Sequence, residues 1–245
     1  MEAGNRCFDD RVPEETNRRI IDHSSDVLLP YTARSRENLL REGIPGERIF
    51  VTGNPIFEAL EAHKKEIDAS AVLSTLGVEA DEFFLVTAHR SENVDDPQRL
   101  KNILDSLGRI TRKYGHPVIC SLHPRTKSMI EKHGLGDLAK SLKLIEPVGF
   151  FDFVKLEKTA FCVITDSGTV QEECCILGKP GVTIRDVTER PETIECGSNI
   201  LSGVEPEAVL RSVAIALGHG HGHPPAEYLE SDVSSKIVKI VLGYA

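Results

Sequence analysis

The segment ITDSGTVQEE (164–173) contains the residue types of a phosphate site. An apolar run ends at Asp166-Ser167-Gly168-Thr169, and a helix-like segment that carries Glu172 and Glu173 follows. In open α/β sheets, ligands bind beyond the carboxyl ends of strands, where a helix N-terminus offers unpaired N–H groups. Ser167 can bond a phosphate oxygen, Gly168 allows close backbone approach, and Glu173 can accept hydrogen bonds from ribose hydroxyls. The alternative is that Asp166 or Ser167 only caps the helix.

Two further segments carry cationic or proton-transferring side chains at expected strand ends. TAHRSEN (87–93) places His89 and Arg90 where a ligand would lie, although a histidine there can also be structural. RDVTERPE (185–192) follows the next strand, and its Arg190 can pair with a diphosphate or stay an exposed arginine.

Acidic side chains crowd the first segment of the chain. Glu2 lies in EAGNR, and Glu14 and Glu15 lie in PEETNRR. Paired carboxylates suit proton transfer, but Pro13 is typical of a first helical position, where acids also favour the helix dipole. The sequence leaves both interpretations open.

The elements that must position these residues alternate between apolar, β-branched runs and longer amphipathic stretches. Strands are expected at 26–29, 49–53, 83–89, 117–123, 161–166 and 181–184. Helices are expected at 14–23, 33–42, 55–65, 97–113, 126–133, 150–158, 168–177, 189–195, 205–217 and 228–242. Continuous apolar strands that are each followed by a helix predict an α/β fold with a parallel, doubly wound sheet.

A domain boundary is expected near 66–80. Only two strand–helix units precede it, too few for a sheet of their own, whereas four follow it. We therefore expect part of one Rossmann-like domain at 1–68 and a complete one with a terminal helix at 69–245.

Composition narrows the class of protein. The chain has 245 residues, 40% hydrophobic and 27% charged, with no run as long as the ~18 apolar residues of a membrane span. A net charge of −9 argues against a nucleic-acid partner. The six cysteines form no CxxC pair, and the N-terminus has no apolar signal region, so we expect reduced thiols and a cytoplasmic location.

The stretch GHGHGHPP (218–225) raises the question of a metal site. His219, His221 and His223 alternate with glycine, which works against a preorganised site. We expect a surface loop and no bound metal.

Together, these motifs resemble one family. EAGNR, PEETNRR, TGNP, TAHRSEN, TDSGTVQEE, LGKP and RDVTERPE occur in this order over residues 1 to about 217, and they are similar to those of the non-hydrolysing UDP-N-acetylglucosamine 2-epimerases. The resemblance implies a glycosyltransferase-B fold, a UDP-sugar substrate, no nicotinamide cofactor, a homodimer in the full-length enzyme and a role in cell-surface polysaccharide biosynthesis. It also implies epimerisation at C2 by elimination and re-addition of UDP through a 2-acetamidoglucal.

The resemblance assigns roles motif by motif. The catalytic residues that it implies are Glu2, Glu14 and His89. The substrate-binding residues that it implies are Arg90, Phe153, Ser167, Gly168, Thr169, Glu173 and Arg190. By the same resemblance, we expect Phe153 to lie near uracil, the Ser167–Thr169 turn to hold the diphosphate, and Glu173 to bind ribose.

The resemblance also leaves open what this chain does. Family members carry a nearly full N-terminal half before the EAG motif, so we expect this chain to lack most of that domain. Three alternatives remain: epimerisation of a modified UDP-2-acetamido sugar, a retaining glycosyltransferase, and a UDP-binding fragment without chemistry.

Overall fold

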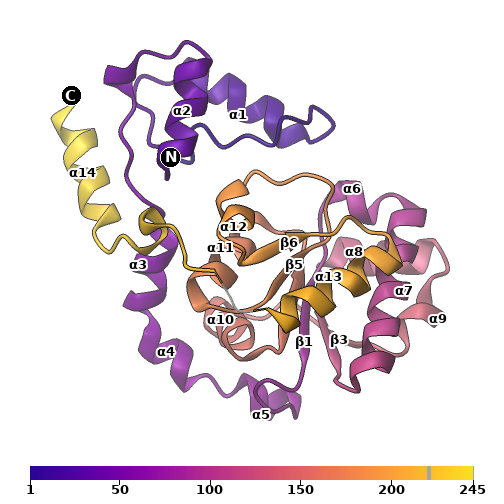
Figure 1. Ribbon diagram of the computed structural model, residues 1–245. Coiled ribbons are helices and arrows are strands. Elements are labelled where there is room, and N and C mark those ends of the chain that lie inside the picture. The colour runs from indigo at the N-terminus through magenta and orange to yellow at the C-terminus, as the bar shows by residue number, and fades with distance from the viewer. Residues whose placement is uncertain (220–221, 245) are drawn as a thin grey trace. The chain divides into compact units, whose positions relative to one another are not determined.

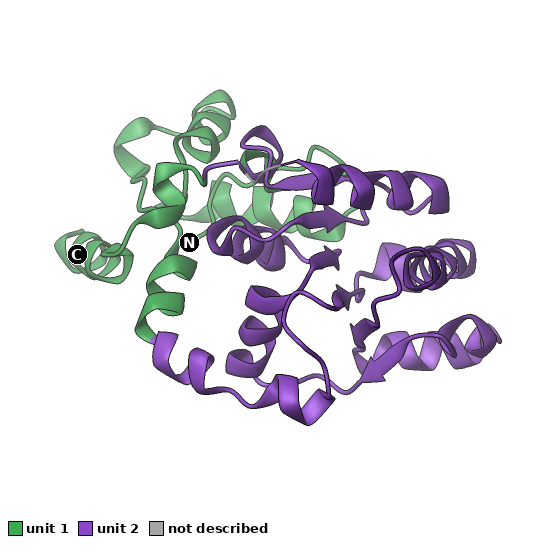
Figure 2. Ribbon diagram, turned by 60° about the horizontal axis from the view of Figure 1, so that its bottom comes forward, with its two compact units in different colours: residues 1–62, 187–192, 224–245 green, residues 63–186, 193–223 purple. Residues whose placement is uncertain are grey.

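The computed structural model describes residues 1–219 and 222–244, and these form two compact units. Unit 1 comprises residues 1–62, 187–192 and 224–245, and unit 2 comprises residues 63–186 and 193–223 (Figure 2). The chain therefore passes between the units more than once.

Unit 2 is built on one six-stranded sheet in which every neighbouring pair is parallel (Figure 1). Its strands are β1 Phe84–Thr87, β2 Val118–Ser121, β3 Lys143–Ile145, β4 Cys162–Thr165, β5 Gly181–Thr183 and β6 Asn199–Leu201. The order is β3-β2-β1-β4-β5-β6, so the chain moves outward from β1 in one direction and then returns to its other side. The point between β1 and β4 is the topological switch point, where α/β sheets bind ligands.

Helices cover both faces of this sheet. They are α4 Lys64–Ala69, α5 Val72–Leu76, α6 Ser91–Val94, α7 Pro97–Tyr114, α8 Pro124–Lys132, α9 Gly136–Ala139, α10 Phe150–Thr159, α11 Gly168–Leu177 and α13 Pro206–Gly218. The short helix α12 Pro191–Glu195 begins in unit 1 and ends in unit 2. Phe84 and Val86 of β1 pack in one apolar cluster with α7 and α13, whereas Leu85 packs in another with α10 and α11. The two-residue period of the strand thus serves two buried layers, as a doubly wound sheet requires.

The α/β fold class expected from the sequence is confirmed. The four expected strands after residue 80 correspond to β1, β2, β4 and β5, but two strands were missed. β3 and β6 are three-residue strands at the two edges of the sheet, and the side chains of β3 are only partly buried. Short edge strands lack the continuous apolar run that marks a central parallel strand.

Unit 1 consists of helices joined by extended segments. Its helices are α1 Pro13–Ser24, α2 Ala33–Arg41, the 3₁₀ turn η1 Gly46–Arg48, α3 Pro55–Ala62, the 3₁₀ turn η2 Ala226–Leu229 and α14 Val233–Gly243. The expectation of full strands at 26–29 and 49–53 was wrong. Within the described part of unit 1 they make a single parallel bridge, between Leu28 and Ile49. These two side chains pack with Leu39 and Ile44 in a small core, which explains the apolar runs without a sheet.

The units differ from the expected division at 68/69 in two respects. The first segment of unit 1 ends at residue 62, and α14 belongs to unit 1 together with residues 187–192. Polar and apolar contacts attach α14 to unit 1: the Ser234 N–H donates to Glu58 of α3 over 2.9 Å, and Val233 is fully buried. The RDVTERPE motif is therefore divided, with Arg185 in unit 2 and Arg190 in unit 1.

Candidate functional site

The loops after β1 and β4 are tied together by one buried carboxylate. Asp166 follows β4 and is fully buried. Its carboxylate accepts the backbone N–H groups of His89, at 3.0 and 3.1 Å, and Arg90, at 3.0 Å. It also accepts from Asn93 Nδ2 at 3.1 Å. Asp166 thus fixes the TAHRSEN loop against the start of α11, which is a role that the sequence analysis did not assign.

The same carboxylate orients the His89 ring. His89 Nδ1 lies 3.2 Å from Asp166 Oδ1, and the side chain is 44% exposed. With the Nδ1 proton directed to Asp166, Nε2 is the nitrogen left to accept or bind a proton. His89 is therefore both held by the fold and accessible to a ligand.

The α11 helix begins without a side-chain cap. Ser167 occupies the N-cap position, but among the described residues its side chain makes no capping hydrogen bond to the first turn. The Ser167 N–H donates to Thr165 Oγ1 over 3.0 Å, and the Asp166 carboxylate is engaged by the TAHRSEN loop. The alternative that Asp166 or Ser167 serves only to cap this helix is thus wrong. The first-turn N–H groups and the Ser167 hydroxyl remain available for an anion.

A cavity of ≈ 300 Å³ lies beside these groups. Its lining combines polar side chains with an apolar floor and consists of Thr87, His89, Ser121, His123, Pro147, Phe153, Ser167 and Val170. Three residues that the sequence analysis selected, His89, Phe153 and Ser167, therefore meet at one site in unit 2. Gly168 is buried directly behind Ser167, Thr169 is exposed on the first turn of α11, and Arg90 is half-buried in the TAHRSEN loop.

Glu173 also lies on α11, farther from this cavity. It has a partner that the sequence analysis missed. Its carboxyl group hydrogen-bonds with that of Glu157 on α10. Glu157 is fully buried and Glu173 is 5% exposed. Burial raises the pKa of Glu157 well above its ordinary value, aided by the Glu173 charge, and it raises the pKa of Glu173 to about 7. Two carboxylates can hydrogen-bond only through a proton, so the pair holds at least one.

In unit 1, the structure brings Glu2 and Arg190 together. The Arg190 guanidinium donates from Nη2 to Glu2 Oε1 and is itself 4% exposed. The Glu2 side chain is 47% exposed, and its backbone has a φ of 60°. The motifs EAGNR and RDVTERPE are thus linked by an ion pair, although they lie 188 residues apart.

The other residues of EAGNR build the loop that presents Glu2. Gly4 has a φ of 77°, and a Cβ there would lie 2.1 Å from the Ser35 carbonyl oxygen, so only glycine fits. The Gly4 N–H donates to Asp22 over 3.0 Å. Arg6 is buried against Asp22 and binds Glu42 through Nε and Nη2 at 2.8 and 2.7 Å. This bidentate contact holds the pKa of Glu42 below its ordinary value.

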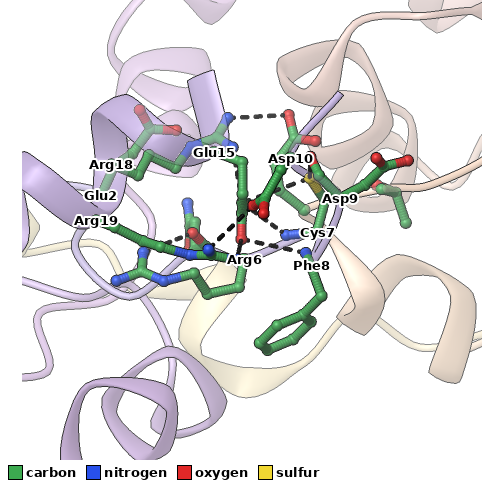
Figure 3. A network of polar contacts seen from close by, with 12 residues as sticks. Glu2, Arg6, Cys7, Phe8, Asp9, Asp10, Glu15, Arg18 and Arg19 are labelled. Atoms are coloured by element: carbon green, nitrogen blue, oxygen red, sulfur yellow. Dashed lines mark hydrogen bonds and ion pairs between the residues drawn. The ribbon is translucent and has the colours of Figure 1, made fainter. Parts of the chain in front are cut away.

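The two neighbouring glutamates of PEETNRR have different environments. Glu15 is fully buried and is the centre of the network in Figure 3. Its carboxylate accepts the N–H groups of Cys7 and Phe8 at 3.0 and 3.1 Å and pairs with Arg19 at 3.1 Å. Glu14 is half-buried in the first turn of α1. The phase of the helix therefore gives Glu15 a structural role and leaves Glu14 nearer to the surface.

The expected site residues thus fall into two sets, one in each unit. Unit 2 holds His89, Arg90, Phe153, Ser167, Gly168, Thr169 and Glu173, and unit 1 holds Glu2, Glu14 and Arg190. Over the described ranges, 1–219 and 222–244, no group of three or more histidine, cysteine or acidic side chains is arranged to hold a metal ion. His221 lies outside these ranges. No helix among the described residues is long and apolar enough to cross a bilayer.

Known proteins resemble this chain over nearly its whole length. The family model described as UDP-N-acetylglucosamine 2-epimerase matches residues 1–242. The curated UDP-N-acetylglucosamine 2-epimerase of Methanocaldococcus jannaschii is 46% identical over 224 residues, which are 89% of this chain and 61% of the relative. The UDP-2,3-diacetamido-2,3-dideoxy-D-glucuronate 2-epimerase of Pseudomonas aeruginosa is 38% identical over 221 residues, 89% of this chain and 60% of the relative.

Among solved structures, the M. jannaschii UDP-GlcNAc 2-epimerase in complex with UDP-GlcNAc and UDP matches with a TM-score of 0.92 at 43% identity. That match covers 100% of this chain and 68% of the other. The chain thus spans about three fifths to two thirds of the length of these relatives.

Proposed function

Because this chain belongs to the UDP-N-acetylglucosamine 2-epimerase family, we propose that it binds UDP-N-acetylglucosamine and takes part in its conversion to UDP-N-acetylmannosamine. The observation that carries the proposal is the cavity at the switch point of unit 2, where His89 and the uncapped start of α11 meet. This is the location and the chemistry that α/β sheets use for nucleotide diphosphates.

The proposed binding mode follows the polarity of the site. The diphosphate accepts hydrogen bonds from Ser167, Gly168 and Thr169 at the positive end of the α11 dipole. Uracil packs beside Phe153 in the apolar part of the cavity, and Glu173 accepts from the ribose hydroxyls. We assign Arg90 and Arg190 to charge neutralisation of the diphosphate.

The proposed chemistry is an elimination followed by a re-addition. A base removes the C2 proton, the electron pair forms the C1–C2 double bond, and the C1–O bond breaks as UDP departs. Reprotonation of the 2-acetamidoglucal at C2 on the opposite face and re-addition of UDP at C1 give the epimer. Two carboxylates, Glu2 and Glu14, serve the two faces of C2, and His89 Nε2 serves proton transfer or the leaving diphosphate.

A modified UDP-2-acetamido sugar is the second candidate substrate, since the P. aeruginosa relative acts on a diacetamido uronate and is 38% identical. The same chemistry would serve it. Free thiols at all six cysteines fit a reducing compartment, and we place the reaction in the cytoplasm, with a homodimer as the assembly of the complete enzyme.

Calorimetric titration with UDP and with GDP tests the nucleotide part of the proposal. UDP should bind and GDP should bind far more weakly. Deuterium incorporation at C2 of UDP-N-acetylglucosamine in heavy water, followed by NMR, tests the chemistry. The exchange experiment should be run with two proteins. One is this chain alone, and the other is this chain fused to the part of the M. jannaschii relative that does not align with it.

A histidine variant gives the specific control. His89→Ala should abolish deuterium incorporation and leave the melting temperature of the protein nearly unchanged. The control His23→Ala, on α1, should leave the exchange rate at the wild-type level. A His89→Ala protein with normal exchange would remove His89 from the mechanism.

A further inference from the structure

The Glu157–Glu173 pair lies one helical turn from the proposed nucleotide cavity on both helices that carry it. On α10, Glu157 follows Phe153 by four residues, and on α11, Glu173 follows Val170 by three. Residues three or four apart share a helix face, and Phe153 and Val170 both line the cavity. The pair therefore extends the lining of the cavity into the interface between α10 and α11.

Among the described residues, Glu157 has no hydrogen-bond partner except the Glu173 carboxyl group. It is fully buried, and among the described residues neither Oε1 nor Oε2 receives a hydrogen bond from an N–H or O–H donor. A buried carboxylate without a donor is strongly unfavourable, so the side chain keeps its proton and donates it to Glu173. The pair is thus a neutral acid facing a carboxylate that has one oxygen engaged and one still able to accept.

We propose that Glu157 is a positioning residue for the nucleotide: it donates its proton to one oxygen of Glu173 and thereby directs the other oxygen to the ribose hydroxyls. This inference rests on the proposed function, because it takes Glu173 as the ribose ligand. It adds a residue to the site that does not itself touch the substrate.

The charged and titratable groups around the pair do not offer another explanation. One thiol lies next to it, Cys174 on α11, and burial raises the pKa of Cys174 well above its ordinary value. This thiol stays neutral at physiological pH. On α4, which packs against α10, Asp68 is already paired with Lys158 at 2.5 Å. α5, β5 and β6 contribute no charged side chain.

If Glu157 served only the fold, we would expect its surroundings to favour an acid there, but they are apolar. Leu156, Val170 and Cys174 form an apolar cluster around this interface, so a leucine at position 157 would pack where a buried acid now lies. An unpaired buried polar group costs stability, and an apolar replacement of similar size removes that cost. An acid that weakens the fold at this place is explained by a contribution to ligand binding.

The test compares UDP with 2′,3′-dideoxy-UDP by calorimetry near pH 8. Both ligands carry the same diphosphate, so its ionisation cancels in the ratio of their Kd values. We expect the wild-type chain to prefer UDP by about tenfold or more, since hydrogen bonds to a charged acceptor are lost in the dideoxy compound. In Glu157→Leu the preference should fall to about threefold or less, with the melting temperature maintained or raised. Glu157→Gln, whose amide N–H replaces the donated proton, should keep about the wild-type preference.

The outcomes separate this inference from the proposed function. A wild-type chain that binds neither ligand overturns both, and one that binds the two equally removes the ribose role of Glu173 and with it this inference. A Glu157→Leu chain that keeps the wild-type preference, or that fails to fold, overturns the inference and leaves the nucleotide site in place. Loss of the preference in a folded Glu157→Gln chain also contradicts it. Asp152→Asn, on the same helix but bonded to Ser70, is the matched control and should change nothing.

Discussion

Glu15 in unit 1 and Glu157 in unit 2 are both fully buried glutamates on helices, but their surroundings differ. Glu15 accepts two backbone N–H groups and pairs with Arg19, and Arg18 lies 3.7 Å away. Among the described residues, the Glu157 carboxyl group hydrogen-bonds with the Glu173 carboxyl group and accepts from no N–H group. Because we propose a role in ligand binding for Glu157 and a structural role for Glu15, burial alone does not distinguish the two kinds of acid. The distinction lies in whether the protein supplies the hydrogen-bond donors.

Asp166 is an instructive third case, because it is satisfied by donors but lies at the proposed nucleotide site. Its partners are the backbone of His89 and Arg90 and the side chain of Asn93. Its hydrogen bonds are structural, and they hold in place the TAHRSEN loop, to which we assign substrate binding. The comparison thus predicts different consequences when each of the three acids is replaced.

The largest effect is expected for Glu15→Ala. The substitution leaves the buried N–H group of Cys7 and the part-buried N–H group of Phe8 without an acceptor, and Phe8 has a strained φ of 54° that these bonds hold. We expect a loss of about 3 kcal/mol in the unfolding free energy of unit 1. Calorimetric unfolding measures it. Glu37→Gln, which removes an exposed ion pair with Arg41, should cost less than about 0.5 kcal/mol, and equal losses in both variants would contradict the comparison.

Asp166→Ala should act on stability and binding together. Losing charge-assisted bonds to the TAHRSEN loop should destabilise unit 2 by about 2 kcal/mol. UDP affinity should fall as well, because His89 and Arg90 are no longer held at the site. Thermal unfolding and calorimetric titration on the same samples measure both effects. Asp186→Asn, at a half-exposed ion pair with Arg99, is the control and should leave both nearly unchanged.

Ser167→Ala should separate binding from stability. Its side chain makes no capping bond within the part of the chain that the structure describes, so the fold should lose almost nothing. UDP binding should weaken by about 1.5 kcal/mol through the lost phosphate contact. Thr32 is the matched cap, because its side chain does accept from the Ser35 N–H over 3.1 Å. Thr32→Ala should cost about 1 kcal/mol of stability. A Ser167→Ala protein that melts much earlier with unchanged UDP affinity would assign Ser167 to the fold instead.

The smallest effect is expected for Glu157→Leu, which should gain unfolding free energy by an amount that depends on pH. In the unfolded chain both carboxyls ionise near pH 4.5, whereas burial raises the pKa of Glu157 well above this and that of Glu173 to about 7. Between these pKa values the folded protein therefore binds more protons than the unfolded chain. As a result, the stability of the wild type falls as the pH rises from 4.5 through 7. The leucine variant lacks the Glu157 contribution, so it should exceed the wild type by about 1 kcal/mol near pH 8 and by less near pH 5. Urea unfolding at the two pH values measures this, and a pH-independent difference would refute the shared proton.

Local sequence determined a large part of the fold of unit 2. The continuous apolar runs of β1, β2, β4 and β5 and the long amphipathic helices α7 and α11 are patterns within single segments, so their periodicity identifies them. The short edge strands β3 and β6 lack such a pattern, and the runs around Leu28 and Ile49 have it without forming a sheet. Whether an extended segment becomes a strand depends on neighbours that are distant in sequence.

The sequence alone also identified the family and selected the motifs to which we assign chemistry, since the order and composition of TAHRSEN and TDSGTVQEE single out His89 and Ser167. Only the tertiary structure decided how these residues act. Because β1 pairs with β4, Asp166 lies against the His89 loop and bonds its backbone. Among the described residues, no side chain then caps the start of α11. The phase of α1 buries Glu15 rather than Glu14, and the packing of α10 on α11 pairs Glu157 with Glu173. These outcomes depend on contacts between segments many residues apart, and burial and hydrogen-bond satisfaction, which set the role of an ionisable side chain, exist only once those segments have packed.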